Sequence, residues 1–131
     1  MGASVVATLQ IGVDIVEIAR VEESLRRFGD RFRGRVYTPG ELTETREAGP
    51  SLAARFAAKE ATIKALGNSA VALHEIEVVR PVGCRPELKL RGRAAAIAAE
   101  LGVQELALSL SHSRDYAVAT VILRRAEPSG S

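Results

Sequence analysis

Hydrophobic positions along the first part of the chain change from a strand pattern to a helical pattern. Residues 5–15 are mostly apolar and β-branched, which predicts a strand that ends near Asp14. The apolar residues that follow recur every three or four positions and predict a helix with one buried face. They are Ile18, Val21, Leu25 and Phe28. Gly29 is the expected end of this helix.

Start and stop signals predict two further helices before the middle of the chain. Thr38 can cap a helix in which Pro39 occupies the first turn and Glu41 lies three residues after the cap. A Gly-Pro pair then interrupts this helix. The next helix is expected over residues 51–66, where a Gly-Asn pair follows it.

The second half of the chain changes to a period of two residues. Apolar and charged residues alternate over residues 75–78 and 87–90, and the proline-containing stretch between them predicts a hairpin. An alanine-rich helix is expected over residues 93–101. Two more strands are expected over residues 106–110 and 116–123, joined by a short turn.

The order of these elements, β-α-α-α-β-β-α-β-β, predicts a single small α+β domain with a mainly antiparallel sheet. We place the domain at residues 1–126 and a flexible tail at residues 127–131. A chain of 131 residues is long enough to bury a core. Aromatic residues make up only 4% of it, so alanine and the aliphatic residues must build that core.

The composition of the chain indicates the cellular compartment and the classes of partner to be expected. The single cysteine, Cys84, can form no intrachain disulfide, which favours a reducing compartment. No apolar run reaches the roughly 18 residues of a membrane span, and the first residues lack the basic segment of a signal peptide, so a cytoplasmic location and no membrane partner are expected. The formal net charge of +2 does not by itself indicate nucleic acid. Six arginines nevertheless cluster in residues 20–35, where they could face an acidic partner.

The predicted helix over residues 51–66 lacks an ordinary polar face. At about 100° per residue, Lys59 falls beside Leu52 and Glu60 falls near Phe56, while alanines occupy most of the remainder. Charges among apolar neighbours are costly unless they are paired or bind something. In one interpretation Lys59 extends its ammonium group to water and Glu60 pairs with a lysine one turn further on. In the other, four charged residues point into a cleft that holds an anionic ligand and a metal ion. They are Arg55, Lys59, Glu60 and Lys64.

Asp14 stands where an apolar strand should have an apolar residue. It can serve as the N-cap of the helix that follows. Alternatively, Asp14 and Glu60 together form a site for a hard cation, because Mg²⁺ prefers oxygen ligands and often takes one or two carboxylates plus substrate phosphates. The residues alone leave both interpretations open.

His112 lies in a predicted turn between two strands, with a serine on either side of it and another at Ser109. A histidine at the surface is the ordinary interpretation of such a position. The hydroxyls and backbone N–H groups of the turn also suit a phosphate. Both interpretations stay open at this point.

Three motifs occur in order, at residues 12–15 (Gly-Val-Asp-Ile), 56–65 (Phe-x-x-Lys-Glu-Ala-x-x-Lys-Ala) and 109–119 (Ser-x-Ser-His, then Tyr-Ala-x-Ala). Each motif is weak alone, but together, in this order and at this spacing, they resemble the holo-[acyl-carrier-protein] synthases, a family of 4′-phosphopantetheinyl transferases. The resemblance covers nearly the whole chain and implies the 4′-phosphopantetheinyl transferase fold. Residues 83–86 (Gly-Cys-Arg-Pro) depart from the Gly-x-Pro turn of the family, but they carry none of the expected site residues.

The resemblance implies an enzyme that transfers 4′-phosphopantetheine from coenzyme A to a serine of apo-acyl carrier protein, releases adenosine 3′,5′-bisphosphate and supports fatty-acid biosynthesis. Asp14 and Glu60 would hold Mg²⁺, and Glu60 and Lys64 would act at the reacting centre. The general base stays open between Glu60 and a metal-bound water. The residues implied to bind coenzyme A are Arg55, Lys59, Lys64, Ser111 and His112.

The resemblance also implies a homotrimer whose active sites lie at subunit boundaries. The strand over residues 116–123, which is apolar on both faces, likewise suggests sheet surface buried between subunits. Arg20, Arg26 and Arg27 would face the acidic helix of the carrier protein, whereas on sequence alone they form a solvated helix face. The competing class is a non-enzymatic module that binds an acidic protein or nucleic acid. It leaves the charged residues near Asp14 and Glu60 unexplained, and no nucleic-acid partner is expected.

Overall fold

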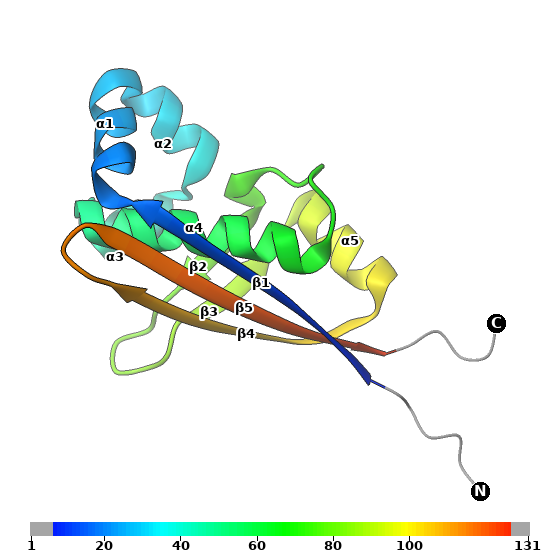
Figure 1. The fold of residues 1–131 in the computed structure, drawn as a ribbon. Helices are drawn as coiled ribbons and strands as arrows, with labels where there is room; N and C mark the ends of the chain where they lie inside the picture. The colour runs from blue at the N-terminus through cyan, green and yellow to red at the C-terminus, as the bar shows by residue number, and fades with distance from the viewer. Residues whose placement is uncertain (1–6, 127–131) are drawn as a thin grey trace, which may run out of the picture.

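The structure is a computed structural model, and it describes residues 7–126 of the chain (Figure 1). In chain order the elements are β1 (Ala7–Glu17), α1 (Ile18–Phe28), α2 (Asp30–Val36), α3 (Pro39–Thr45), α4 (Gly49–Leu66), the 3₁₀ turn η1 (Leu73–Glu75), β2 (Ile76–Val79), β3 (Glu87–Leu90), α5 (Gly92–Leu101), β4 (Val103–His112) and β5 (Tyr116–Ala126). The predicted tail at residues 127–131 and the predicted start of the first strand lie outside the described residues. Within residues 7–126 none of the helices is both long and apolar enough to cross a membrane.

All strand pairs are antiparallel, as predicted, but they form two sheets rather than one. Three long strands make a sheet in the order β1-β5-β4, and β2 and β3 form a separate hairpin. Helix α4 lies along one face of the three-stranded sheet. The β2–β3 hairpin and α5 lie on the side of α4 that faces away from β1 and β5 (Figure 1). The α+β fold is therefore confirmed, with a central helix between two β layers.

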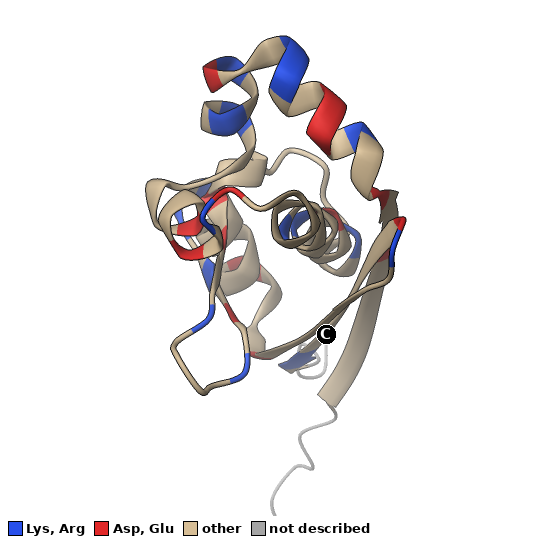
Figure 2. Cartoon of the chain, turned by 90° about the vertical axis from the view of Figure 1, so that its left-hand side faces the viewer, with Lys and Arg blue, Asp and Glu red and all other residues tan. Residues whose placement is uncertain are grey.

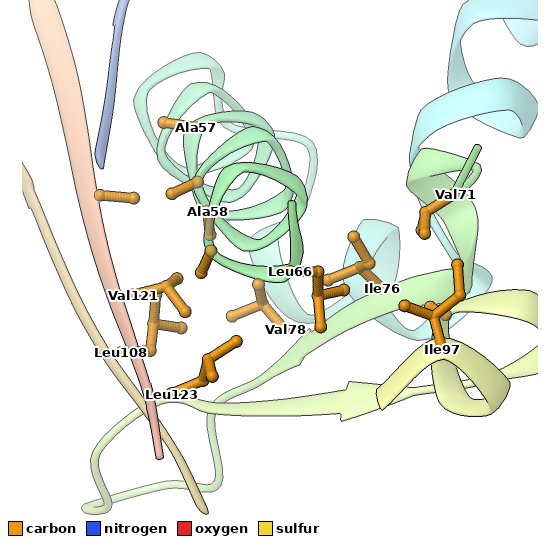
Figure 3. Close-up of a cluster of buried hydrophobic side chains, with 14 residues drawn as sticks. Ala57, Ala58, Leu66, Val71, Ile76, Val78, Ile97, Leu108, Val121 and Leu123 are labelled. Atoms are coloured by element: carbon orange, nitrogen blue, oxygen red, sulfur yellow. The ribbon is translucent and has the colours of Figure 1, made fainter. Parts of the chain in front are cut away.

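The core is built around α4, and small side chains let the other elements approach it closely. Ala57, Ala58 and Ala61 are fully buried and belong to one cluster with Val121 of β5 and Val78 of β2. Figure 3 shows most of this cluster around α4. A second apolar cluster surrounds the other end of α4 and includes residues from α1 and the end of α2. Because α4 is in contact on most sides, a charged residue on one of its buried sides needs a partner inside the molecule.

Local sequence signals set most of the element ends. Thr38 and Glu41 form the predicted capping box at the start of α3, each side chain accepting from the other's backbone N–H. The expected ending of α4 before Gly67 is also confirmed. Helix α2 was not predicted, because its seven residues include three arginines and only two large apolar side chains, Phe32 and Val36. It packs on its neighbours through those two residues.

Strand β1 has its polarity reversed relative to an ordinary half-buried strand. Its outward side chains are large and apolar, whereas Gln10, Gly12 and Asp14 point towards α4. The outward residues Leu9, Ile11, Val13 and Ile15 are 62%, 63%, 53% and 64% exposed. Directly across the pair, Ile122 of β5 extends the same apolar face beside Ile11. This face has no cover within the described part of the chain.

Gly12 brings β1 unusually close to α4. A Cβ atom at this position would lie 1.8 Å from the carbonyl oxygen of Ala61, well inside van der Waals contact. Only glycine therefore permits the observed spacing between strand and helix. The close approach carries Asp14, two residues further along β1, to the part of α4 that bears Glu60 and Lys64.

Candidate active site

A cleft of about 550 Å³ opens between β1, α1 and α4. Asp14 enters it from β1, Arg20 from α1, and Glu60 and Phe56 from α4. The lining also includes Ser24 and Phe32, neither of which the sequence had indicated as a site residue. The two carboxylates predicted to form a cation site therefore face the same space, as expected.

Asp14 is a side chain of the strand and not the cap of the following helix. The N-cap residue of α1 is Glu17, and no side chain caps that helix. The Asp14 carboxylate instead accepts a hydrogen bond from Lys64 at 3.0 Å. Lys64 also donates to the Val13 carbonyl at 2.9 Å. Lys64 therefore pairs with Asp14 and not, as the first of the two interpretations of this helix would have it, with Glu60.

Glu60 has no hydrogen bond or ion pair within residues 7–126, although it is partly buried. Burial raises the pKa of Glu60 above its ordinary value, and the negative charge of Asp14 raises it further. The Lys64 ammonium group acts in the opposite direction. Two carboxylates that repel each other in one cleft are a set of donors suited to a divalent cation, which would remove the repulsion.

Arg55 lies on a different side of α4 from Glu60, because the five-residue step between their positions turns the helix by a net angle of about 140°. Its guanidinium group donates to the Val78 carbonyl at 2.8 Å and to the Glu44 carboxylate at 2.7 Å. It lines a smaller pocket, of about 200 Å³, together with Ser111 and His112 at the end of β4. The interpretation in which all four charged residues of α4 point into one cleft is therefore wrong for a single chain.

The smaller pocket contains two residues that sequence reasoning missed, Arg80 and Glu44. Arg80 follows β2, and its backbone N–H is bound by the Glu44 carboxylate of α3. The predicted polar turn at His112 is shorter than expected, since β4 continues through this residue. No periodic pattern marked Arg80 or Glu44, because only the packing of α3 beside β2 brings them together.

Lys59 is completely buried and does not reach either pocket. Its ammonium group donates to the Glu41 carboxylate at 2.7 Å, to the Leu73 carbonyl at 3.3 Å and to the Ile76 carbonyl. Burial lowers the pKa of Lys59, and the charge of Glu41 opposes this shift. All three protons of the ammonium group thus have acceptors inside the protein, so the lysine neither reaches water nor presents a donor to an anion in this chain.

The first helix carries the arginines expected to meet the carrier protein. Arg20 lines the large cleft and makes no ion pair within the described residues. Arg26 pairs with Glu23 on the same helix, and Arg27 lies over the Phe28 ring at 5.4 Å from its centroid. Basic segments alternate with acidic ones over α1 and α2, at the top of Figure 2. Of the three arginines, Arg20 is the one placed to act at the cleft.

Known proteins share both the sequence and the fold. A family model described as the 4′-phosphopantetheinyl transferase superfamily matches residues 10–121. The chain is 47% identical over 121 residues to the holo-[acyl-carrier-protein] synthase of Koribacter versatilis, covering 88% of this chain and 97% of the relative. It is 51% identical over 119 residues to the synthase of Halorhodospira halophila, covering 86% and 94%.

Solved structures of such synthases superimpose closely. The complex of the Chronobacterium ammoniagenes synthase with CoA matches with a TM-score of 0.81 at 36% identity, covering 92% of this chain and 99% of that chain. The Helicobacter pylori synthase in complex with coenzyme A gives 0.78 at 31% identity, covering 86% and 98%. The chain therefore belongs to the 4′-phosphopantetheinyl transferase superfamily and, within it, to the holo-[acyl-carrier-protein] synthase family of enzymes. The resemblance based on the three motifs is confirmed.

Proposed function

We propose that this enzyme transfers 4′-phosphopantetheine from coenzyme A to a serine of apo-acyl carrier protein, with Mg²⁺, in support of fatty-acid biosynthesis. The observation that carries the proposal is the convergence of Asp14 and Glu60 in one cleft, with Arg20 at its side. The family membership supplies the reaction class. Coenzyme A in the complexes of the Chronobacterium and Helicobacter synthases supports the donor.

Asp14 and Glu60 would hold the metal ion, since their oxygens are hard donors that line the same cleft of about 550 Å³. Within residues 7–126 no group of three or more acidic, histidine or cysteine side chains could hold a metal by itself. Two carboxylates leave positions for phosphate oxygens, the arrangement that Mg²⁺ usually takes with nucleotides. When bound, the ion would neutralise charge on the pyrophosphate.

The chain's own residues would position the reactants and compensate charge, which is most of what phosphoryl transfer asks of a protein. The carrier serine oxygen forms a bond to the β-phosphorus of coenzyme A, the bond from that phosphorus to the bridging oxygen breaks, and adenosine 3′,5′-bisphosphate leaves. Lys64 would stabilise the developing negative charge, because its ammonium group is half exposed and keeps one proton beyond its two bonds. The serine proton would pass to Glu60 or to a water held by Glu60.

The direct test is to mix the protein with coenzyme A, Mg²⁺ and apo-acyl carrier protein and to measure the mass of the carrier. We expect the carrier to gain one phosphopantetheine group. A carrier whose target serine is replaced by alanine, and a reaction in EDTA, are the controls and should show no gain. An unmodified wild-type carrier in the complete mixture would contradict the proposal.

Coenzyme A would span two copies of the chain in a homotrimer. Arg55, Ser111 and His112 line a pocket separate from the cleft of Asp14 and Glu60, so one chain presents two halves of the expected site. The apolar outward face of β1 supports burial between subunits, because exposed apolar surface of this kind favours association. We propose that the cleft of one copy and the smaller pocket of its neighbour form each complete site.

Mixing two inactive variants tests this assembly. We expect Asp14→Asn chains and His112→Ala chains each to be nearly inactive, and co-expressed chains to recover about a quarter of wild-type activity, because half of the clefts and half of the pockets remain intact and combine at random. Light scattering should give about three times the chain mass of 14.0 kDa. A monomer in solution, or co-expressed chains that stay inactive, would contradict the shared site.

Arg20 should act on the carrier protein rather than on coenzyme A. We expect Arg20→Glu to raise the KM for the carrier about tenfold while leaving the KM for coenzyme A nearly unchanged, because surface charges act mainly on encounter. Added salt should weaken carrier use by the wild type, since such contacts are screened within roughly 10 Å at 0.1 M salt. Arg93→Glu on α5 makes the same change of charge elsewhere and is the matched control. A larger effect of Arg20→Glu on coenzyme A would refute the assignment.

A further inference from the structure

Apolar packing alone defines the orientation of α4 poorly. Alanines occupy several sides of the helix, and buried residues occur around nearly its whole circumference. Because several sides of α4 carry the same small side chain, a rotation about the helix axis would replace one set of alanine contacts by a similar set. One residue corresponds to about 100° of rotation, enough to turn Glu60 away from β1. The close contact of Gly12 with Ala61 limits the position of this helix on the side of β1, and a directed polar interaction on another side would fix its rotation.

Lys59 provides such an interaction on the side of α4 that faces away from the cleft. Its ammonium group is held by three acceptors from three elements: Glu41 of α3, Leu73 of η1 and Ile76 of β2. Three directed hydrogen bonds to one fully buried group tolerate little displacement. Lys59 precedes Glu60 in the sequence, so the position of one sets the position of the other.

Glu41 is itself rigidly held. Its carboxylate accepts from the backbone N–H of Thr38 at 3.0 Å and from that of Val78 at 2.8 Å, in addition to Lys59. The Thr38 hydroxyl in turn donates to Glu77 at 2.6 Å. No buried side-chain nitrogen or oxygen lacks a partner in the described part of the chain. A fully satisfied network of this kind restricts its members to one arrangement.

One turn earlier on α4, a second pair repeats the arrangement. Arg55 binds Glu44 of α3 and the carbonyl of Val78, just as Lys59 binds Glu41 and the carbonyl of Ile76. The cations are four residues apart, the carboxylates three and the carbonyls two, which matches the periods of the two helices and the strand. α4 is thus fastened to α3 and β2 along one line.

We infer that Glu41 and Lys59 are positioning residues, whose buried ion pair fixes the orientation of α4 so that Glu60 faces Asp14 in the cleft. Neither side chain touches the substrates in this role. The inference rests on the proposed function, because it assigns to Glu60 a task that requires accurate placement. Displacement of a catalytic group by about 1 Å can reduce a rate about 100-fold, so orientation is a sufficient reason for the pair.

Stability alone is a weak reason for a buried ion pair. The cost of removing two charges from water largely offsets their attraction. Replacement of both partners by neutral residues is therefore often tolerated, whereas removal of one partner leaves a buried charge without a partner. The effect on the fold and the effect on the cleft can therefore be separated by comparing single and double variants.

The experiment uses Glu41→Gln, Lys59→Met and the double variant Glu41→Gln/Lys59→Met in the full-length protein. Three quantities are measured: the melting temperature, kcat and KM for each substrate, and the dissociation constant of Mn²⁺ by electron paramagnetic resonance in the presence of coenzyme A. The matched control is Glu75→Gln, because Glu75 also accepts from two backbone N–H groups, of Ala72 and Arg93, but has no partner on α4.

We expect the double variant to regain most of the melting temperature lost by either single variant, since it leaves no unpaired charge. Its kcat should nevertheless stay about 10- to 100-fold below that of the wild type, with KM for coenzyme A changed less than about threefold. Mn²⁺ should bind about tenfold more weakly to it. Glu75→Gln should change the melting temperature without changing kcat or Mn²⁺ affinity.

Two results would overturn the inference. A double variant with wild-type kcat and Mn²⁺ affinity would show that the pair serves the fold only. A Lys59→Met variant that raises KM for coenzyme A while Glu41→Gln does not would show that the lysine binds the substrate itself. If the wild type fails to modify the carrier, the proposed function fails, but the Mn²⁺ measurement still decides whether the pair organises the cleft.

Discussion

Glu60→Gln should abolish phosphopantetheine transfer and at the same time make the metal-free protein more stable. We expect transfer to fall about 10³-fold or more, because the variant loses a proposed metal ligand and proton acceptor. Stability should rise because the carboxylate is partly buried near Asp14 with no hydrogen-bonding partner within residues 7–126. Loss of function combined with a gain of stability is typical of a residue retained for chemistry.

The gain of stability should depend on pH. Burial and Asp14 raise the pKa of Glu60 in the folded protein, so the folded state holds its proton more tightly than the unfolded state. The destabilising effect of Glu60 is thus absent below its unfolded pKa, roughly 4, and is complete above the raised pKa of the folded state. Glu60→Gln should therefore raise the melting temperature at neutral pH and not at low pH.

Thermal unfolding in EDTA over a series of pH values measures this difference. Asp14→Asn should lose transfer equally but gain no stability, because Asp14 is the partner of Lys64. Glu100→Gln, exposed on α5, should change neither quantity. Retention of transfer within about tenfold by Glu60→Gln would remove Glu60 from the reacting centre.

Gly12→Ala should destabilise the protein by about 3 kcal/mol or more, because overpacking against backbone atoms cannot be relieved by a side-chain rotation. The added methyl group would lie 1.8 Å from the Ala61 carbonyl oxygen, so β1 and α4 must move apart. The melting temperature should fall by on the order of 10 °C. Any folded fraction should also transfer poorly, since the same movement separates Asp14 from Glu60.

Gly34→Ala is the matched control. Gly34 lies in α2, and no atom outside its two chain neighbours and the backbone of its own helix lies within 4 Å of the position that a Cβ atom would take. Alanine in a helix is more favourable than glycine by about 0.5–1 kcal/mol, so this variant should be as stable as the wild type or slightly more so. Thermal unfolding of the two variants compares the same chemical change in a closed and in an open environment. Equal melting temperatures would refute the packing argument.

The sequence predicts elements well where the signal is local. The capping box of Thr38 and Glu41, the end of α4 and the β2–β3 hairpin all depend on neighbouring residues, and all are confirmed. Helix α2 was missed because its short, arginine-rich segment carries too few apolar residues to show a period. Its stability comes from tertiary contacts, which local patterns do not contain.

The candidate site was predictable in part. The pattern marked Asp14 and Glu60 as carboxylates in unusual positions, and the structure brings them to one cleft. The spacing of about 100° per residue also marked Lys59 as a charge among apolar residues. It could not identify the partner, because Glu41 lies 18 residues away in sequence. Arg55 was grouped with Glu60 and Lys64 because the angular spacing along a helix does not show which neighbouring element each side of the helix meets.

The reversed polarity of β1 would let one strand take part in both the proposed assembly and the proposed reaction. Alternate residues of this strand serve the two purposes: one set forms the apolar outer face, and the other set supplies Gly12 and Asp14. Side chains of a strand alternate with a period of two. Insertion or deletion of one residue within β1 would therefore exchange the two sets at once. Bulky residues would then meet α4, and the carboxylate would enter the outer face. A substitution within β1 therefore affects one face of the strand at a time, whereas a change in the length or register of β1 affects both faces together.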